Sequence, residues 1–162
     1  MARDKVLEQD DLIDVLTDLR HEGRRVATTN GCFDVLHVGH LRYLEAAKDV
    51  GDILVVLLNS DPSVQRLKGA SRPIVPEAER AEMLSGLACV DYVCIFNQDT
   101  PVDLLERIRP NTHIKGGDYS AQSLPEAPVL EGMGTEIVFI PLIEGRSTTN
   151  LVQRILEVYQ PA

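Results

Sequence analysis

The chain has 162 residues, of which 44% are hydrophobic and 25% are charged, which is ordinary for a soluble globular protein with a sizeable core. Its formal net charge is −9, so the surface as a whole should repel nucleic acid, and we expect no nucleic-acid partner. Any polyphosphate site must therefore be local, built from a helix N-terminus and a few basic residues.

Cysteine usage and hydropathy bear on the cellular compartment. Cys32, Cys89 and Cys94 lack the spacing of a metal-binding set, and the last two lie in apolar surroundings, where a reduced thiol is expected. No apolar run reaches membrane-spanning length, and the first residues do not lead into the core of a signal peptide. We therefore expect a cytoplasmic protein without a membrane partner.

Hydrophobic spacing predicts alternating helices and strands along the chain. Residues 1–8 are expected to be loose, and residues 9–22 to form an amphipathic helix that Gly23 ends. Strands are predicted at five apolar runs, at residues 26–29, 53–58, 92–96, 113–115 and 136–140. The other helices are predicted at 41–51, briefly after 59–62, and at 77–87, 101–108, 125–131 and from 148 onward.

Capping residues and apolar faces refine two of these helices. Thr100 is predicted to be an N-cap with Pro101 at the first helical position, since proline needs no hydrogen-bond partner there. The final helix is expected to be capped from Ser147 and to turn Leu151, Ile155 and Val158 toward the core.

The order of elements predicts a Rossmann-like α/β fold, with a doubly wound, parallel, five-stranded sheet and helices on both faces. We expect one domain over residues 1–162, with 1–24 as an N-terminal helical extension and 25–160 as the core. Sheets of this kind bind ligands beyond the carboxyl ends of their strands. Unusual polar stretches follow four predicted strands, at residues 29–40, 59–61, 116–119 and 145–150.

The segment after the first strand carries the strongest functional signal. Residues 28–40 read Thr-Thr-Asn-Gly-Cys-Phe-Asp-Val-Leu-His-Val-Gly-His. A strand that runs through a glycine turn into a helix presents free N–H groups and the positive end of the helix dipole to an anion. Gly39 allows the backbone to approach a phosphate that His37 and His40 can both face. A plain turn with two surface histidines is the alternative interpretation.

This segment resembles the H-x-G-H signature of the cytidylyltransferase-like nucleotidyltransferases. In that family the two histidines steady the α-phosphate of a nucleoside triphosphate while it is attacked, which would make His37 and His40 catalytic. The resemblance covers about residues 26–155. It also implies nucleotide contacts for the neighbouring residues Asn30, Gly31, Cys32, Phe33 and Gly39.

Ser147, Thr148 and Thr149 resemble the S-T-T element of the same family, which grips the triphosphate opposite the histidines. A plain helix N-cap would need only one of these hydroxyls. Arg146, directly before them, can stack on the base or bind a phosphate.

Residues 115–119 read Lys-Gly-Gly-Asp-Tyr, which resembles a stretch of the adenylyltransferases of ADP-heptose synthesis. Gly116 and Gly117 leave room for a flat base or a ribose, and Asp118 can accept hydrogen bonds from hydroxyls. All three are expected to bind the nucleotide. His113, just before them, is expected to be structural.

Basic residues elsewhere complete the expected site. Residues 66–73 form a predicted basic loop, for which a solvated surface loop is the alternative. The resemblance implies that Lys68 closes over the phosphates as a third catalytic group. It also implies a phosphate contact for Arg80, although an arginine on a helix is usually at the surface. Residues expected to bind the acceptor are Asp34, Asn59, Arg66 and Arg72, and Asp34 can instead orient the loop or hold metal-bound water.

The implied reaction transfers AMP from ATP to D-glycero-D-manno-heptose 1-phosphate, giving ADP-heptose and pyrophosphate for lipopolysaccharide precursor synthesis. The acceptor phosphate is already an anion, so catalysis would rest on positioning and charge stabilisation. The resemblance implies Mg²⁺ bound through the nucleotide phosphates, without metal ligands from the protein. Many relatives carry a fused sugar kinase that is missing here, so we expect a stand-alone form. Separately, we expect a homodimer or larger homo-oligomer.

Two other functions stay open. A CTP-using cytidylyltransferase acting on glycerol 3-phosphate, or on a similar phosphorylated alcohol, shares H-x-G-H and S-T-T. Such enzymes typically carry a tryptophan after the Gly-Asp turn, where this chain has Tyr119 and no tryptophan anywhere. A non-catalytic nucleotide-binding sensor is the second alternative, and His37, His40 and Lys68 argue against it. A receiver-like domain would need acids at the first strand end, where Thr-Asn-Gly stands.

Overall fold

The computed structural model describes residues 2–117, 124–141 and 147–159. Its five strands form one parallel sheet in the order β3-β2-β1-β4-β5, which confirms the predicted doubly wound architecture. The strands are β1 (Val26–Gly31), β2 (Ile53–Asn59), β3 (Tyr92–Phe96), β4 (Thr112–Gly116) and β5 (Glu136–Ile140). Strand order reverses on either side of β1, so the topological switch point lies at the carboxyl ends of β1 and β4.

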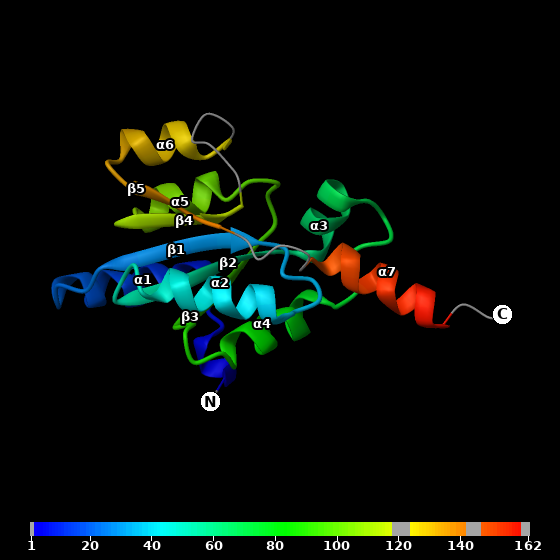
Figure 1. The fold of residues 1–162 in the computed structure, drawn as a ribbon. Helices are drawn as coiled ribbons and strands as arrows, with labels where there is room; N and C mark the ends of the chain where they lie inside the picture. Colours follow the sequence, from blue (N-terminus) through cyan, green and yellow to red (C-terminus); the bar gives the residue numbers. More distant parts are fainter. Residues whose placement is uncertain (1, 118–123, 142–146, 160–162) are drawn as a thin grey trace.

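Helices cover both faces of the sheet, as predicted. In Figure 1, α2 and α4 lie on one side of the strands and α5 and α6 on the other. The apolar side chains of α1 share the α5 and α6 core, whereas those of α2 and α4 build a separate core on the opposite face. These helices are α1 (Gln9–His21), α2 (Val38–Lys48), α4 (Glu77–Ser85), α5 (Val102–Ile108) and α6 (Ala127–Gly132).

The side-chain alternation of β1 assigns its residues to the two faces. Val26 belongs to the α1/α5/α6 core and Ala27 to the α2/α4 core. By the same alternation, Thr28 and Asn30 face α5 and α6, while Thr29 faces α2. All seven residues of β2 are buried, which explains why its sequence is apolar without alternation.

Two helices lie beyond the carboxyl edge of the sheet (Figure 1), α3 (Asp61–Lys68) and α7 (Thr148–Tyr159). Residues 66–73 are therefore not a loop throughout, because Arg66 and Lys68 belong to the last turn of α3. The helix ends at Gly69, whose φ of +99° suits a residue without a Cβ atom. The predicted loop is limited to the segment after Lys68.

The prediction that residues 1–8 are loose is wrong. Ala2–Lys5 form the short 3-10 helix η1, and Leu7 donates its backbone N–H to the Val93 carbonyl at 2.9 Å. The Lys5 ammonium donates to the Val90 carbonyl at 2.8 Å. Strand β3 lies at the edge of the sheet and offers unpaired backbone groups, and the sequence pattern of the first residues does not reveal this partner.

The expected inward face of the last helix is also wrong. Ile155 is 49% exposed and Val158 is 55% exposed, and no described residue of α7 is buried. Helix α7 extends away from the sheet in Figure 1, which leaves Ile155 and Val158 exposed, whereas Leu151, nearer the start of the helix, is half-buried. None of the described helices is long and apolar enough to cross a bilayer.

Smaller differences concern element ends. Strand β1 continues to Gly31, because Asn30 and Gly31 pair with Leu57 and Leu58 of β2. Pro101, rather than Thr100, is the N-cap of α5, and no side chain caps that helix.

Candidate functional site

A cavity of about 530 Å³ opens at the carboxyl edge of the sheet, around the ends of β1, β2 and β4. This is where a doubly wound sheet binds its ligands, because the strand order reverses there. Of the residues predicted to form the site, the structure brings twelve to this cavity, Asn30, Gly31, Cys32, Phe33, Asp34, His40, Asn59, Lys68, Arg72, Gly116, Thr148 and Thr149.

The two histidines lie together where α2 begins. His37 is the N-cap of α2, and its Nδ1 accepts a hydrogen bond from the Gly39 N–H at 3.1 Å. A neutral His37 ring must then carry its proton on Nε2, which makes that nitrogen a donor. His40 lies in the first turn, with its ring stacked on that of His37 at a centroid distance of 3.9 Å. The structure thus produces the predicted pairing, with His40 lining the cavity.

His40 is neutral at pH 7. Burial of the ring, and then the neighbouring His37, lower its pKa to about 4. Its Nδ1 is buried and has no hydrogen-bond partner among the described residues. A neutral imidazole at a helix N-terminus can donate one hydrogen bond, and the adjoining free N–H groups favour an anion at the same place.

The turn between β1 and α2 packs against the histidine pair through Phe33. The Phe33 ring lies 5.3 Å from the His40 ring, and its backbone φ is +43°, in the left-handed region. A Cβ atom on Gly31 would come within 3.0 Å of the Phe33 ring. Glycine at position 31 therefore leaves space for the Phe33 ring to lie over the end of β1, where it packs against the His40 ring.

Tyr43 anchors the first turns of α2 to the sheet. Its hydroxyl lies 2.6 Å from the Thr29 hydroxyl and donates to the Ile114 carbonyl at 3.1 Å. Burial raises the Tyr43 pKa to about 12, so the hydroxyl keeps its proton and remains a donor. Sequence analysis missed this residue, although its spacing of three from His40 places both on neighbouring parts of one helix face.

Asp34 orders the segment that follows α3. Its carboxylate pairs with the Arg72 guanidinium at 2.5 Å and accepts the backbone N–H groups of Ile74 and Val75 at 2.8 and 2.9 Å. These contacts match the loop-orienting role considered for Asp34. Lys68 lines the same part of the cavity and makes no hydrogen bond or ion pair with the described residues.

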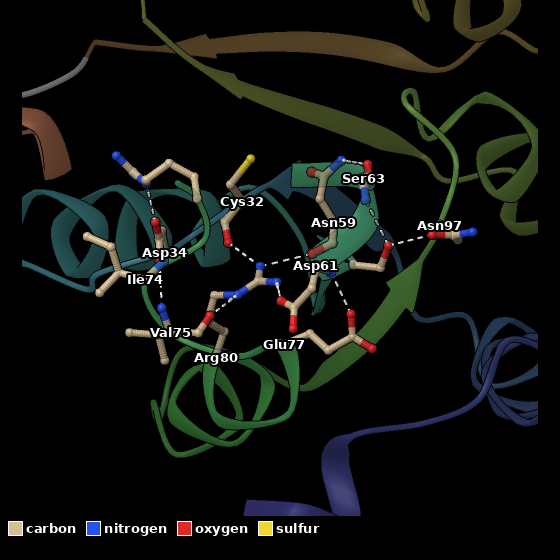
Figure 2. A network of polar contacts seen from close by, with 12 residues as sticks. Cys32, Asp34, Asn59, Asp61, Ser63, Ile74, Val75, Glu77, Arg80 and Asn97 are labelled. Carbon is tan, nitrogen blue, oxygen red and sulfur yellow. Dashed lines mark hydrogen bonds and ion pairs between the residues drawn. The ribbon is translucent and has the colours of Figure 1, made fainter. Parts of the chain in front are cut away.

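Arg80 does not line the cavity, because its guanidinium lies inside the protein (Figure 2). It donates to the carbonyl oxygens of Val75, Cys32 and Asn59 at 2.9, 2.6 and 2.9 Å. It also pairs with the Asp61 carboxylate at 2.7 Å, and only 1% of the residue is exposed. The guanidinium ties the ends of β1 and β2 to α3 and α4, and the structure gives no support to its predicted phosphate contact.

Four other predicted residues lie beside the cavity without lining it. Arg66 is paired with Asp99 at 2.6 Å on the surface and also donates to the Asn97 carbonyl. Gly117 has a φ of +113° and donates its N–H to the Ile140 carbonyl at 3.0 Å. The others are the buried Gly39 within α2 and Ser147, which caps α7 by accepting from the Asn150 N–H at 3.1 Å.

Asp118 and Arg146, both expected to contact the nucleotide, lie outside the described residues. The N-terminus of α7 is described, and it brings Thr148 and Thr149 to the cavity. The Thr148 hydroxyl donates to the Val35 carbonyl at 3.4 Å, which links α7 to the turn that carries the histidines. The S-T-T and H-x-G-H elements therefore meet at one cavity.

A buried polar network that sequence analysis missed forms the α5/α6 wall. The Lys115 ammonium pairs with the Glu126 carboxylate at 2.7 Å and donates to Asn30 Oδ1 at 2.6 Å. Behind it, His113 Nδ1 lies 2.8 Å from the Thr28 hydroxyl, in line with the expected structural role of His113. Local sequence offers no signal for the pairing of Lys115 with Glu126, because the two meet only through the fold.

The side chains around the cavity indicate how a metal ion could be bound there. Among the described residues, no group of three or more histidine, cysteine or acidic side chains is arranged to hold one. Asp34, the acid nearest the histidine turn, is already engaged by Arg72 and two backbone N–H groups. The described residues thus offer no cage of protein ligands for a divalent ion.

Comparison of the chain with known protein families agrees with the fold and the cavity. The chain belongs to the cytidylyltransferase-like family, whose model matches residues 28–153, from β1 into α7. This confirms the resemblance that the H-x-G-H and S-T-T elements indicate.

Particular relatives narrow the family further. The chain is 47% identical to the bifunctional protein HldE of Syntrophotalea carbinolica and 46% identical to that of Geobacter metallireducens, in each case over 96% of this chain and 32% of the relative. The chain thus spans about a third of the length of these curated relatives. It also resembles the crystal structure of the lipopolysaccharide core biosynthesis protein from Thermoplasma volcanium, at 28% identity and a TM-score of 0.63. That match covers 75% of this chain and 99% of the other.

Proposed function

We propose that the chain is a nucleotidyltransferase that moves AMP from ATP to D-glycero-D-manno-heptose 1-phosphate, releasing pyrophosphate and forming ADP-heptose. The observation that carries the proposal is the stacked pair of His37 and His40 at the N-terminus of α2, of which His40 lines the cavity at the switch point of the sheet. The heptose assignment is supported by the relatives, bifunctional proteins of which this chain spans about a third, and by the lipopolysaccharide core neighbour.

The residues at the cavity suit an in-line displacement at phosphorus. An acceptor phosphate oxygen attacks the α-phosphorus of ATP, and the bond to the bridging oxygen of pyrophosphate breaks. No side-chain nucleophile is required, because the acceptor oxygen is already anionic at neutral pH. His37 through Nε2–H and His40 through its one N–H donate to α-phosphate oxygens, and this donation strengthens as charge builds in the transition state.

The basic residues offset the repulsion between two anionic substrates. The Lys68 ammonium lies at the cavity without a partner among the described residues and reaches toward the phosphates, while Arg72 is held nearby by Asp34. Thr148 and Thr149 bind the triphosphate at the N-terminus of α7, beside the histidine turn that Thr148 contacts through the Val35 carbonyl. Mg²⁺ bound to the nucleotide phosphates would lower the charge on the leaving pyrophosphate.

Nucleotide choice follows from the shape of the cavity near β4. Gly116 lines the cavity and adds no side chain, which leaves room for a purine. A site that hydrogen-bonds its base rejects an analogue far more strongly than one that only packs it. We expect kcat/KM with ATP to exceed that with CTP by on the order of 10²-fold.

The deciding experiment measures pyrophosphate release with ATP, CTP, GTP and UTP, each with the same heptose 1-phosphate and again with glycerol 3-phosphate. A preference for ATP and heptose 1-phosphate supports the proposal. Equal rates with ATP and CTP, or a preference for CTP with glycerol 3-phosphate, would replace it with the cytidylyltransferase alternative. Nucleotide binding without pyrophosphate release from any pair would favour a sensor.

A further inference from the structure

The cavity has two walls of different chemistry, defined by the two faces of the sheet. The first, which we call the phosphate wall, contains His40, Thr148 and Thr149 at helix N-termini. The second, which we call the hydroxyl wall, consists of Asn30, Lys115 and Glu126. Ile114 belongs to the α2 core, so alternation along β4 places Lys115 on the α5/α6 side.

We propose that the Lys115–Glu126 pair is the specificity-determining element for the acceptor and binds hydroxyl groups of its sugar ring. This inference rests on the proposed function, because it assigns the acceptor's sugar to the hydroxyl wall and the nucleotide's phosphates to the phosphate wall. Lys115 and Glu126 both line the cavity, and neither was expected to contact a substrate.

Contacts with Asn30 and Glu126 hold the Lys115 ammonium in place and leave N–H groups that can bind a ligand. The ammonium donates a hydrogen bond to Asn30 Oδ1 at 2.6 Å. It also forms an ion pair with Glu126 Oε1 at 2.7 Å, and that buried oxygen has no hydrogen-bond partner among the described residues. The Lys115 side chain is 17% exposed. Lys115 therefore keeps N–H donors, and Glu126 an acceptor oxygen, for a ligand in the cavity, and the mobility of both side chains is restricted by their contacts.

Glu126 is a buried carboxylate that stays ionised. Only 2% of the residue is exposed, and burial by itself would disfavour its charge. The neighbouring His113 ring and the Lys115 ammonium outweigh that effect and lower the Glu126 pKa to about 2. Its Oε1 is 3.7 Å from His113 Nε2, too far for a hydrogen bond, and that ring nitrogen is buried without a partner among the described residues.

The charge of this pair distinguishes a hydroxyl site from a phosphate site. Lys115 and Glu126 together carry no net charge, so they offer little attraction to a triphosphate. They do present a donor and an acceptor side by side. A sugar hydroxyl both donates and accepts, so it can use both groups at once, whereas a phosphate oxygen can only accept.

The test compares KM values for the two substrates in pyrophosphate-release assays on the full chain. The principal variant is K115M/E126Q, which removes both charges, because removing only one would leave an unpaired buried charge and destabilise the protein. We expect the KM for heptose 1-phosphate to rise about tenfold or more, the scale of a lost hydrogen bond to a charged group. The KM for ATP should stay within about twofold.

As a control, a second double substitution removes an ion pair of similar length that does not line the cavity. Lys48 pairs with Asp91 at 2.6 Å, and neither residue lines the cavity, so K48M/D91N should leave both KM values unchanged. An equal rise of both KM values in K115M/E126Q, or an unchanged heptose 1-phosphate KM, would overturn the proposal. If a thermal-unfolding assay shows that K115M/E126Q does not fold, K115R takes its place. This variant keeps the ion pair but moves the donors, so the KM for heptose 1-phosphate must still rise.

Sugar analogues sharpen the assignment to hydroxyls. Among heptose 1-phosphates that each lack one hydroxyl, at least one should lose about tenfold in kcat/KM with the wild-type chain. In K115M/E126Q that loss should disappear, because the partner of the missing hydroxyl is already gone. Losses of the same size in both proteins would contradict the proposal.

A binding measurement separates this inference from the proposed reaction. If no nucleotide yields pyrophosphate with wild type, the proposed function fails, and calorimetric titration of heptose 1-phosphate without nucleotide still decides the role of the pair. Weaker binding to K115M/E126Q than to wild type would support it. Equal binding to both proteins, or no binding to either, would overturn it.

Discussion

Two basic side chains near the cavity, Arg80 and Lys68, differ in nearly every physical respect. Arg80 is 1% exposed and directs its guanidinium at three carbonyl oxygens and one carboxylate. Lys68 is exposed at the end of α3 and makes no hydrogen bond or ion pair in the described part of the chain. The planar guanidinium of arginine has five N–H donors in a fixed geometry, which suits oxygen atoms at fixed positions inside a protein. The ammonium of lysine sits on a flexible chain, which suits contact with a bound ligand.

The comparison separates residues that build the cavity from residues that act in it. Arg80 joins the segment after β1 and the end of β2 to the helices beyond them (Figure 2). Lys68, His40 and Thr149 keep polar atoms for the cavity itself. Substitutions in the first group should therefore change stability, and substitutions in the second should change turnover while the fold is kept.

The largest expected effect is the loss of stability on removing the buried guanidinium. Arg80→Met leaves the Asp61 carboxylate and three carbonyl oxygens without their donor, which should lower the free energy of unfolding by about 3–5 kcal/mol. Urea denaturation followed by circular dichroism measures this. As a control, Arg107→Met removes an exposed pair with Asp10 and should change stability little. An Arg80→Met protein as stable as wild type, with its turnover abolished, would instead restore a phosphate role to Arg80.

His40→Ala should act in the opposite way. Loss of a donor to the transition state is expected to lower kcat by at least about 10²-fold, with little change in melting temperature. Pyrophosphate release at saturating substrates measures the rate. His21→Ala, at the exposed end of α1, is the control and should retain full activity. Near-normal turnover in His40→Ala would rule out the role assigned to His40.

Lys68→Ala should have a smaller effect, about tenfold on kcat. The ammonium is proposed to offset repulsion between the two substrates, mainly once both are bound, as in sites where a segment closes over its ligands. The KM for ATP should change less than kcat. The control is Arg24→Ala, which removes a charge just before β1, at the opposite edge of the sheet. Equal losses in both variants would point to net charge rather than to a local contact.

The smallest expected effect concerns pH and the buried imidazoles. His40 has a pKa lowered to about 4 and His113 a pKa lowered by burial, so the unfolded chain binds more protons than the folded one below its histidine pKa of about 6.5. Their contribution to stability is complete above about pH 6.5 and is lost as the pH falls toward 4. The urea midpoint should fall less between pH 7 and pH 5 in His40→Gln than in wild type. An equal fall in both proteins would show that His40 does not contribute to the pH dependence of stability.

Much of the fold follows from local pattern. Five apolar runs became five strands, and β2 lies between two neighbours as its unbroken run Ile53 to Leu58 indicates. The histidine pair was equally predictable, because a helix that begins at Val38 necessarily brings His37 and His40 to the same end. In both cases the relevant partners are close in sequence, or the signal depends on burial of whole segments.

Other features depend on partners that are distant in sequence. Arg80 and Lys68 both look like phosphate ligands, and only the packing of α4 against the ends of β1 and β2 buries one of them. Helix α7 carries an apolar stripe that predicts a buried face, but it lies beyond the sheet edge, so Ile155 and Val158 of that stripe stay exposed.

The sequence by itself determined the order of the elements, the parallel sheet and the histidine turn, because hydrophobic period and turn chemistry act over a few residues. Only the tertiary structure decided which charges are buried and which reach the cavity, since that depends on contacts such as Lys115 with Glu126. The strength of such an ion pair depends on how far each partner is removed from water, a quantity that no local pattern contains.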